Sequence, residues 1–184
     1  MSEETTVEVT PKVGVTASKT EAKGPQRQWL FIYAPGAGSN IHDPFGTFAC
    51  DWLSEQGITA VRFQFPYMET RRKFPDRQVM LEETWSRVID TFHDPALKLV
   101  VGGRSMGGRI ASHVVAGEAN VDALTLFAYP LHPPRDVLKV RDEHFPHIQS
   151  PTILCSGDRD TFASSDQIKD AARKIPNASV RILA

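Results

Sequence analysis

One serine stands between two glycines at a spacing that suits a nucleophile. Gly103, Ser105 and Gly107 form a G-x-S-x-G pattern between an apolar run at 97–101 and a helix-like run at 106–116. A strand that enters a helix through so tight a turn strains its middle residue and exposes the Ser105 hydroxyl. The glycines are expected because side chains there would collide where strand and helix pass each other. The alternative is a glycine-rich turn with an idle serine.

A serine nucleophile also needs N–H donors for the oxyanion of a tetrahedral intermediate. The backbone N–H of Met106 is one such donor, because it would lie at the N-terminus of the helix after Ser105. The second donor is expected in the loop 35–38, which reads Pro-Gly-Ala-Gly and follows an apolar run. We predict the Ala37 N–H, with Gly36 as the alternative. The other interpretation of this loop is a plain turn after a strand.

The acid that orients a catalytic base is expected after the apolar run ending near Cys155. Asp158 and Asp160 both lie there, in the segment Ser-Gly-Asp-Arg-Asp. We favour Asp160, because the turn before it is long enough to carry a carboxylate toward the serine. Asp158 is the alternative, and a helix N-cap or a simple loop carboxylate is the third interpretation.

The base is missing from its expected place. On this scaffold the order along the chain is serine, acid, histidine, so the histidine should follow Asp160. The six histidines are His42, His93, His113, His132, His144 and His147, and all of them precede it. We interpret the chain as truncated at its C-terminus, after the last strand. The alternatives are a domain without a complete triad, or His132 as a substitute base.

Two arginines flank the serine in sequence. Arg104 and Arg109 could bind a carboxylate of a substrate, or each could pair with a carboxylate of the protein itself. We predict substrate contacts for Arg104 and for His132, which follows the apolar run at 123–128. No metal site is expected.

The order of elements predicts how these residues meet. Apolar runs at 29–34, 58–65, 97–101, 123–128, 152–155 and 180–183 predict strands, and helical spacing covers about 45–53, 81–92, 106–116 and 165–175. Such alternation predicts an α/β fold, with a doubly wound, mostly parallel sheet covered on both faces. The carboxyl ends of the strands then share one edge, where ligands bind. Trp52 and Trp85 lie in apolar helical stripes and are expected in the core.

Composition limits the remaining possibilities. A chain of 184 residues with 41% hydrophobic residues suits one domain, predicted at 29–184. Residues 1–28 contain no aromatic residue and are expected to be mostly a flexible tail, although 6–15 could add an edge strand. A net charge of −1 argues against nucleic-acid binding. Two isolated cysteines, no signal sequence and no long apolar run predict a cytoplasmic protein without a membrane partner. These features carry no prediction of oligomeric state.

Several motifs together resemble a known family. The chain is similar, over about residues 29–184, to small α/β-hydrolase-fold proteins related to dienelactone hydrolases. Within them it resembles the branch that includes a subunit of the chromatin (NSL) complex and testis-expressed homologues. The motifs are Ala-Pro-Gly-Ala-Gly at 34–38, Gly-Gly-Arg-Ser-Met-Gly-Gly-Arg at 102–109, Tyr-Pro-Leu-His-Pro-Pro at 129–134, Arg-Asp-Glu-His at 141–144 and Ser-Gly-Asp-Arg-Asp at 156–160. The resemblance implies Ser105 as nucleophile and Asp160 as acid. The chain departs from the pattern by ending before the motif that would carry the histidine.

We therefore predict a cofactor-independent serine hydrolase that acts on an ester or related acyl bond of a small molecule. The connection at 129–150 is too short for a large lipase-type lid, so we expect a small, open acyl pocket. The alternative is a non-catalytic binding or scaffold module with a partner surface at 129–147.

Overall fold

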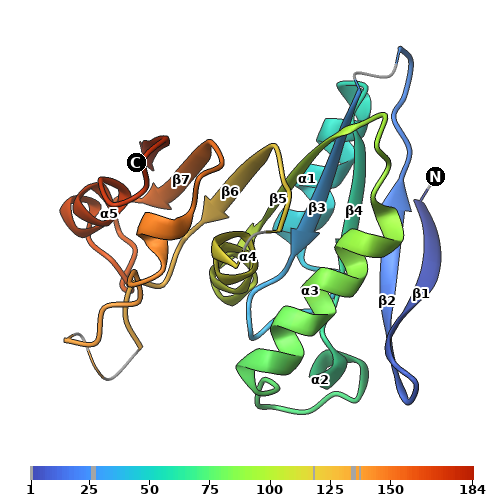
Figure 1. Cartoon of the computed structure of the whole chain (residues 1–184), viewed down its shortest axis with the longest axis horizontal. Helices are drawn as coiled ribbons and strands as arrows, with labels where there is room; N and C mark the ends of the chain where they lie inside the picture. Colours follow the sequence, from blue (N-terminus) through green and yellow to red (C-terminus); the bar gives the residue numbers. More distant parts are fainter. Residues whose placement is uncertain (1, 26–27, 118, 134–135, 137) are drawn as a thin grey trace.

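The computed structural model describes residues 2–25, 28–117, 119–133, 136 and 138–184, and it forms one eight-stranded sheet with helices (Figure 1). The strands are β1 (Ser2–Thr10), β2 (Val13–Thr20), β3 (Trp29–Ala34), β4 (Thr59–Phe63), β5 (Lys98–Arg104), β6 (Ala123–Phe127), β7 (Thr152–Gly157) and β8 (Ala178–Leu183). The α-helices are α1 (Pro44–Glu55), α2 (Pro66–Glu69), α3 (Gln78–Phe92), α4 (Met106–Ala116) and α5 (Ser165–Ala172), and a 3₁₀ turn, η1, spans Phe145–His147.

The strands from β3 to β8 form the predicted parallel sheet. Strand order is β1-β2-β4-β3-β5-β6-β7-β8, and every pair from β4 to β8 is parallel. Within this parallel part the chain begins at β3, adds β4 on one side, and then continues with β5 on the other side. The loops after β3 and β5 therefore lie next to each other at a point where strand order reverses, and such points bind ligands in open α/β sheets. This topology confirms the doubly wound prediction.

The N-terminal segment differs from the flexible tail expected for residues 1–28. Strands β1 and β2 form an antiparallel hairpin, and β2 continues the sheet by pairing antiparallel with β4. The hairpin is ordered because its alternate residues are buried, namely Val7, Val9, Val15 and Ala17. The weak alternation at 6–15 was therefore the better signal, and the absence of aromatic residues was misleading.

The helices cover the two faces of the sheet unequally. Buried residues of α3, α4 and α5 share one large core with the sheet, whereas α1 packs on the opposite face over a smaller cluster. Trp85 on α3 is fully buried, as predicted. The core prediction for Trp52 on α1 is wrong, because this side chain is 54% exposed, beside an exposed Phe48. Both side chains line a wholly apolar hollow of about 310 Å³ between α1 and the sheet.

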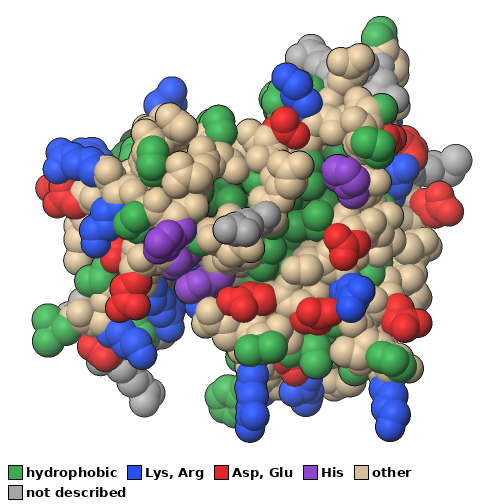
Figure 2. All heavy atoms as spheres, in the orientation of Figure 1, with side chains coloured by type: hydrophobic (Ala, Val, Ile, Leu, Met, Phe, Trp, Pro, Cys, Tyr) green, Lys and Arg blue, Asp and Glu red, His purple; other side chains and the backbone are tan. Residues whose placement is uncertain are grey.

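The longest helix is α3, with 15 residues. Within the described part of the chain, no helix is both long and apolar enough to cross a bilayer. The apolar side of α3 faces the sheet and α4, and acidic side chains lie over its outer side (Figure 2). Its sequence thus matches a helix that has one buried and one solvated face.

Candidate functional site

Ser105 is the single residue that connects β5 to α4. Its backbone has φ 51° and ψ −118°, in the positive-φ region that side chains normally avoid. Two hydrogen bonds hold this conformation: the Ser105 N–H donates to the Phe127 carbonyl at 2.8 Å, and the Arg109 N–H donates to the Ser105 carbonyl at 2.9 Å. Strain of this kind persists only where the surroundings impose it, and it clusters at functional sites.

The glycines beside Ser105 allow strand and helix to pass closely, as predicted. A Cβ placed on Gly103 would lie 2.5 Å from the Ala34 carbonyl oxygen and 2.7 Å from the Gly107 carbonyl carbon. A Cβ on Gly107 would likewise meet the Ala34 carbonyl. Only residues without a Cβ can occupy these two positions while β3, β5 and α4 keep their spacing.

The loop after β3 lies against the serine. A Cβ on Gly36 would come within 3.5 Å of the Ser105 Cβ. Ala37, Met106 and Ser105 line one hollow of about 300 Å³. The Tyr67 hydroxyl donates a hydrogen bond of 2.7 Å to the Ala37 carbonyl and so restrains this loop. Sequence reasoning did not identify this contact, because Tyr67 lies on the short helix α2, which was not predicted.

Asp160 and Ser105 line a second, open hollow of about 630 Å³, together with Arg104 and Asp158. The Asp160 carboxylate is half-buried and accepts hydrogen bonds from the Ser156 hydroxyl at 3.2 Å and the Phe162 N–H at 2.8 Å. Asp158 is more exposed, and its nearest cation is Arg159 at 4.0 Å. Asp160 is therefore the better oriented of the two carboxylates.

Neither hollow that Ser105 lines has a histidine among its described lining residues. His132, which we predicted as a substrate contact, is buried outside both hollows. Its Nδ1 lies 3.2 Å from the Pro133 carbonyl oxygen, which suits a structural histidine. The structure thus brings together Ser105, Met106, Ala37, Arg104 and Asp160, but not His132.

Arg104 lines the same hollow as Ser105 and Asp160, and it also faces a protein carboxylate. Its Nη1 lies 3.9 Å from Asp43 Oδ1. Asp43 is buried and caps α1, accepting hydrogen bonds from the Gly46 N–H at 2.8 Å and the Tyr33 hydroxyl at 2.7 Å. Burial, followed by the hydrogen bond to Asp43, raises the pKa of Tyr33, so its hydroxyl stays a donor. This cap was not predicted from the sequence, although an Asp-Pro pair at 43–44 directly before the amphipathic stripe of α1 is a pattern typical of a helix start.

Arg109, unlike Arg104, has no carboxylate within 4 Å among the described residues. It lies one turn along α4 from Ser105 and lines the 300 Å³ hollow together with Arg141. Burial lowers the pKa of Arg109, and the neighbouring charge of Arg141 lowers it further. Arg141 belongs to the Arg-Asp-Glu-His motif at 141–144, and the sequence alone predicted no role for it.

A pair of stacked histidines lies behind these arginines. The rings of His113 on α4 and His144 before η1 are 3.7 Å apart, and His144 Nε2 lies 2.7 Å from the Ser112 hydroxyl. Burial lowers the pKa of His144 to about 3, with smaller contributions from His113 and Arg109. Histidine side chains also gather beside α4 in the space-filling view (Figure 2). This cluster ties the loop after β6 to α4 through neutral imidazoles.

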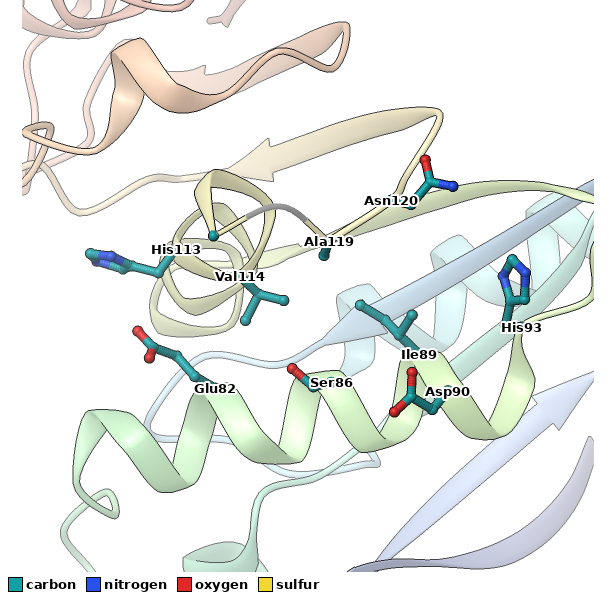
Figure 3. A pocket seen from close by; sticks show the side chains of 10 residues that line it. Glu82, Ser86, Ile89, Asp90, His93, His113, Val114, Ala119 and Asn120 are labelled. Carbon is teal, nitrogen blue, oxygen red and sulfur yellow. The ribbon is translucent and has the colours of Figure 1, made fainter.

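Another hollow, of about 610 Å³, lies between α3 and α4 (Figure 3). Glu82, Asp90 and His93 line it from α3 and its C-terminal end, opposite His113. It reaches Ala119 and Asn120, which precede β6, so it extends to the amino ends of the strands. The serine lies at the carboxyl ends, and this hollow is therefore separate from the candidate site.

The assembled groups suit acyl transfer. A strained serine at a helix N-terminus lines one hollow with Met106 and Ala37, the residues whose N–H groups were predicted to hold an oxyanion. A carboxylate held by two hydrogen bonds lines the same open hollow as the serine, as an acid that orients a base requires. The contributing loops follow β3, β5 and β7, at one edge of the sheet.

Comparison with known proteins agrees with this architecture. Residues 27–184 match a family described as alpha/beta hydrolase domain. An alpha-beta serine hydrolase homologue from Coxiella burnetii superposes with a TM-score of 0.83 at 20% identity, covering 98% of this chain and 86% of that one. Dienelactone hydrolase from Anabaena variabilis gives 0.79 at 20% identity, covering 100% and 85%. A lidless a/b serine hydrolase from Xanthomonas campestris gives 0.75 at 19%, covering 99% and 83%. At these identities the likeness establishes the fold alone, and it confirms the fold predicted from the sequence.

Proposed function

The chain belongs to the alpha/beta hydrolase domain family, and from this premise we propose that it is a serine hydrolase acting on an ester or related acyl bond. One observation carries the proposal: Ser105, at positive φ before α4, shares a hollow with the hydrogen-bonded carboxylate of Asp160. The strand–serine–helix turn is then a nucleophile elbow. Placement in the dienelactone hydrolase-related branch, with its chromatin-complex and testis-expressed members, and the cytoplasmic location remain predictions from the sequence.

In the proposed mechanism, Ser105 Oγ attacks the acyl carbon and passes its proton to an imidazole. The Met106 and Ala37 N–H groups stabilise the negative oxygen of the tetrahedral intermediate. The imidazolium then protonates the leaving alcohol, which departs and leaves an acyl-serine. Water attacks the acyl-serine in the same way and releases the acid. No cofactor takes part in this scheme.

This scheme needs an imidazole, and no histidine is among the described residues that line the two hollows beside Ser105. The 630 Å³ hollow between Ser105 and Asp160 is open and extends to Leu183 and Ala184. We propose that a histidine imidazole occupies it in the active enzyme, with Asp160 accepting a hydrogen bond from its ring. Asp160 would hold the ring in the orientation needed to take the serine proton.

Imidazole rescue tests this proposal on the chain of 184 residues. Added imidazole should enter the open hollow and produce a saturable hydrolysis of p-nitrophenyl acetate. The Ser105→Ala variant, at the same imidazole concentrations, measures the reaction of imidazole with the ester alone. We expect the protein-dependent rate to vanish in Ser105→Ala, and Asp160→Asn to lower it at least ~10-fold. Asp158→Asn serves as the matched carboxylate variant, and a larger loss there would assign the acid to Asp158.

A fluorophosphonate probe distinguishes the enzyme from the alternative, a binding or scaffold module. Covalent labelling at Ser105, accelerated by imidazole and absent in Ser105→Ala, would support the hydrolase. The absence of a histidine from the described lining of both serine hollows is the observation that favours the alternative. An unlabelled chain, with and without imidazole, would decide for that alternative and for a partner surface at 129–147.

A further inference from the structure

The 300 Å³ hollow beside Ser105 is lined by two arginines and by a short apolar wall. Arg109 and Arg141 line it together with Ser105, Ala37 and Met106. Its apolar wall consists of Pro75, Leu81, Pro130 and Phe162. A cavity that combines a nucleophile, an apolar stretch and two cations suits a ligand that has a reactive acyl carbon, an apolar chain and an anionic group.

The two guanidinium groups have no anionic partner within the described chain. Neither forms an ion pair within 4 Å, although Arg72, Arg87 and Arg104 all have one. Glu82 is near enough to influence Arg109 but forms no ion pair with it. Asp76 lines the same hollow, but its carboxylate already pairs with Arg72 and accepts a hydrogen bond from the Tyr67 N–H at 2.8 Å. Positive charge therefore exceeds negative charge in this cavity.

Both arginines are held in place by their backbones. Arg109 lies within α4, where its N–H bonds to the Ser105 carbonyl at 2.9 Å. The Arg141 N–H donates to the Leu131 carbonyl at 2.7 Å, and its carbonyl accepts from the Tyr129 hydroxyl at 2.8 Å. Burial and mutual repulsion lower the pKa of Arg109, which is the state of a cation that lacks its counter-ion. Guanidinium groups suit the planar, two-oxygen geometry of a carboxylate, and these two start from fixed backbone positions.

We propose that the substrate's acyl group carries a carboxylate, which Arg109 and Arg141 bind in the hollow that Ser105 also lines. This inference rests on the proposed function, because it places the scissile acyl carbon at Ser105. Arg109 lies four residues beyond Ser105, a rise of about 6 Å along a helix axis. A chain of a few methylene groups along the Phe162 and Pro130 wall spans this distance. The substrate class is thus a monoester of a short dicarboxylic acid.

Paired substrates test the inference in the imidazole-supplemented assay. Mono-p-nitrophenyl glutarate carries the carboxylate, and its methyl ester has the same chain without the charge. We expect kcat/KM to be about 10-fold or more higher for the charged ester, since a charge-assisted hydrogen bond is worth at least that factor. Arg109→Gln and Arg141→Gln should remove most of this preference for the charged ester, seen as a fall in the ratio of the two kcat/KM values. Arg173→Gln, an exposed arginine that pairs with Asp170, is the matched control and should retain the preference.

A binding measurement keeps this inference separate from the proposed function. Calorimetric titration of Ser105→Ala with monomethyl glutarate should show binding that is weakened in Ser105→Ala/Arg109→Gln and absent for dimethyl glutarate. If no ester is hydrolysed but this charge-dependent binding persists, the hydrolase proposal fails and the carboxylate site stands. Equal kcat/KM for both esters, together with binding that ignores the charge or the arginines, would overturn the inference.

Discussion

At the scale of single residues, the backbones of β3, β5 and α4 pass very close to one another around Ser105. Ser105 adopts φ 51° because β5 must turn into α4 without a loop, directly beside the carbonyl end of β3. Gly103 and Gly107 make this possible, since neither position has room for a Cβ. The strained serine and its glycines are therefore one structural unit.

Gly103→Ala tests that unit. The new Cβ would lie 2.5 Å from the Ala34 carbonyl oxygen and 2.7 Å from two backbone atoms of α4, all of them rigid. We expect a loss of about 3 kcal/mol or more in the free energy of unfolding, as for overpacked cores. Urea denaturation followed by circular dichroism measures it. Gly38→Ala is the control, because nothing lies within 4 Å of its Cβ position, and a similar loss there would refute the steric explanation.

At the scale of elements, the start of α1 connects the candidate site to the less covered face of the sheet. Asp43 caps this helix through the Gly46 N–H and also accepts the buried Tyr33 hydroxyl. Arg104, which precedes Ser105, lies 3.9 Å from the same carboxylate. One buried side chain thus joins α1, β3 and the end of β5.

Asp43→Ala should lower the free energy of unfolding by about 2–4 kcal/mol, because it removes a helix cap and leaves the Tyr33 hydroxyl without an acceptor. Asp43→Asn retains an acceptor oxygen and should lose less. Thermal and urea unfolding give the values. Asp51→Ala, at an exposed position of the same helix, is expected to leave stability unchanged within about 0.5 kcal/mol. An equal effect at both positions would contradict the cap.

At the scale of the whole molecule, the loop after β6 is held to the domain through neutral histidines. His144 stacks on His113 and contacts Ser112, and burial lowers its pKa to about 3. In an unfolded chain the same ring would titrate near 6.5. Between pH 3 and pH 6.5 the unfolded chain binds one more proton at this ring than the folded protein does. The stability that the neutral His144 ring contributes is therefore complete above pH 6.5 and is lost as the pH falls toward 3.

We therefore expect the wild type to lose more stability between pH 7 and pH 4 than His144→Gln, by about 1–3 kcal/mol after discounting for partial exposure. Glutamine can maintain the hydrogen bond to Ser112 but cannot take up a proton. Urea unfolding across this pH range provides the comparison. His42→Gln, at an exposed position, should follow the wild-type profile. Parallel profiles for wild type and His144→Gln would show that His144 does not titrate on unfolding.

Local sequence patterns predicted much of this architecture. The run 106–116 coincides with α4, and α5 lies within the helical spacing predicted at about 165–175, where Ser164 and Gln167 form a capping box. These predictions succeeded because apolar periodicity and capping residues act over a few neighbouring positions. The hairpin of β1 and β2 was foreseen only as a possible edge strand at 6–15, because its order depends largely on pairing with β4.

The sequence by itself determined the parallel sheet, the strained turn at Ser105 and the shared edge on which Asp160 and Ala37 lie. Periodicity and glycine spacing encode these features locally. Only the tertiary structure decided which charged groups meet: Arg104 faces Asp43, Arg109 and Arg141 line one hollow, and His132 is buried outside the hollows that Ser105 lines. Such pairings join residues that are far apart in the chain, and their partners follow from packing in three dimensions, which spacing along the sequence does not specify.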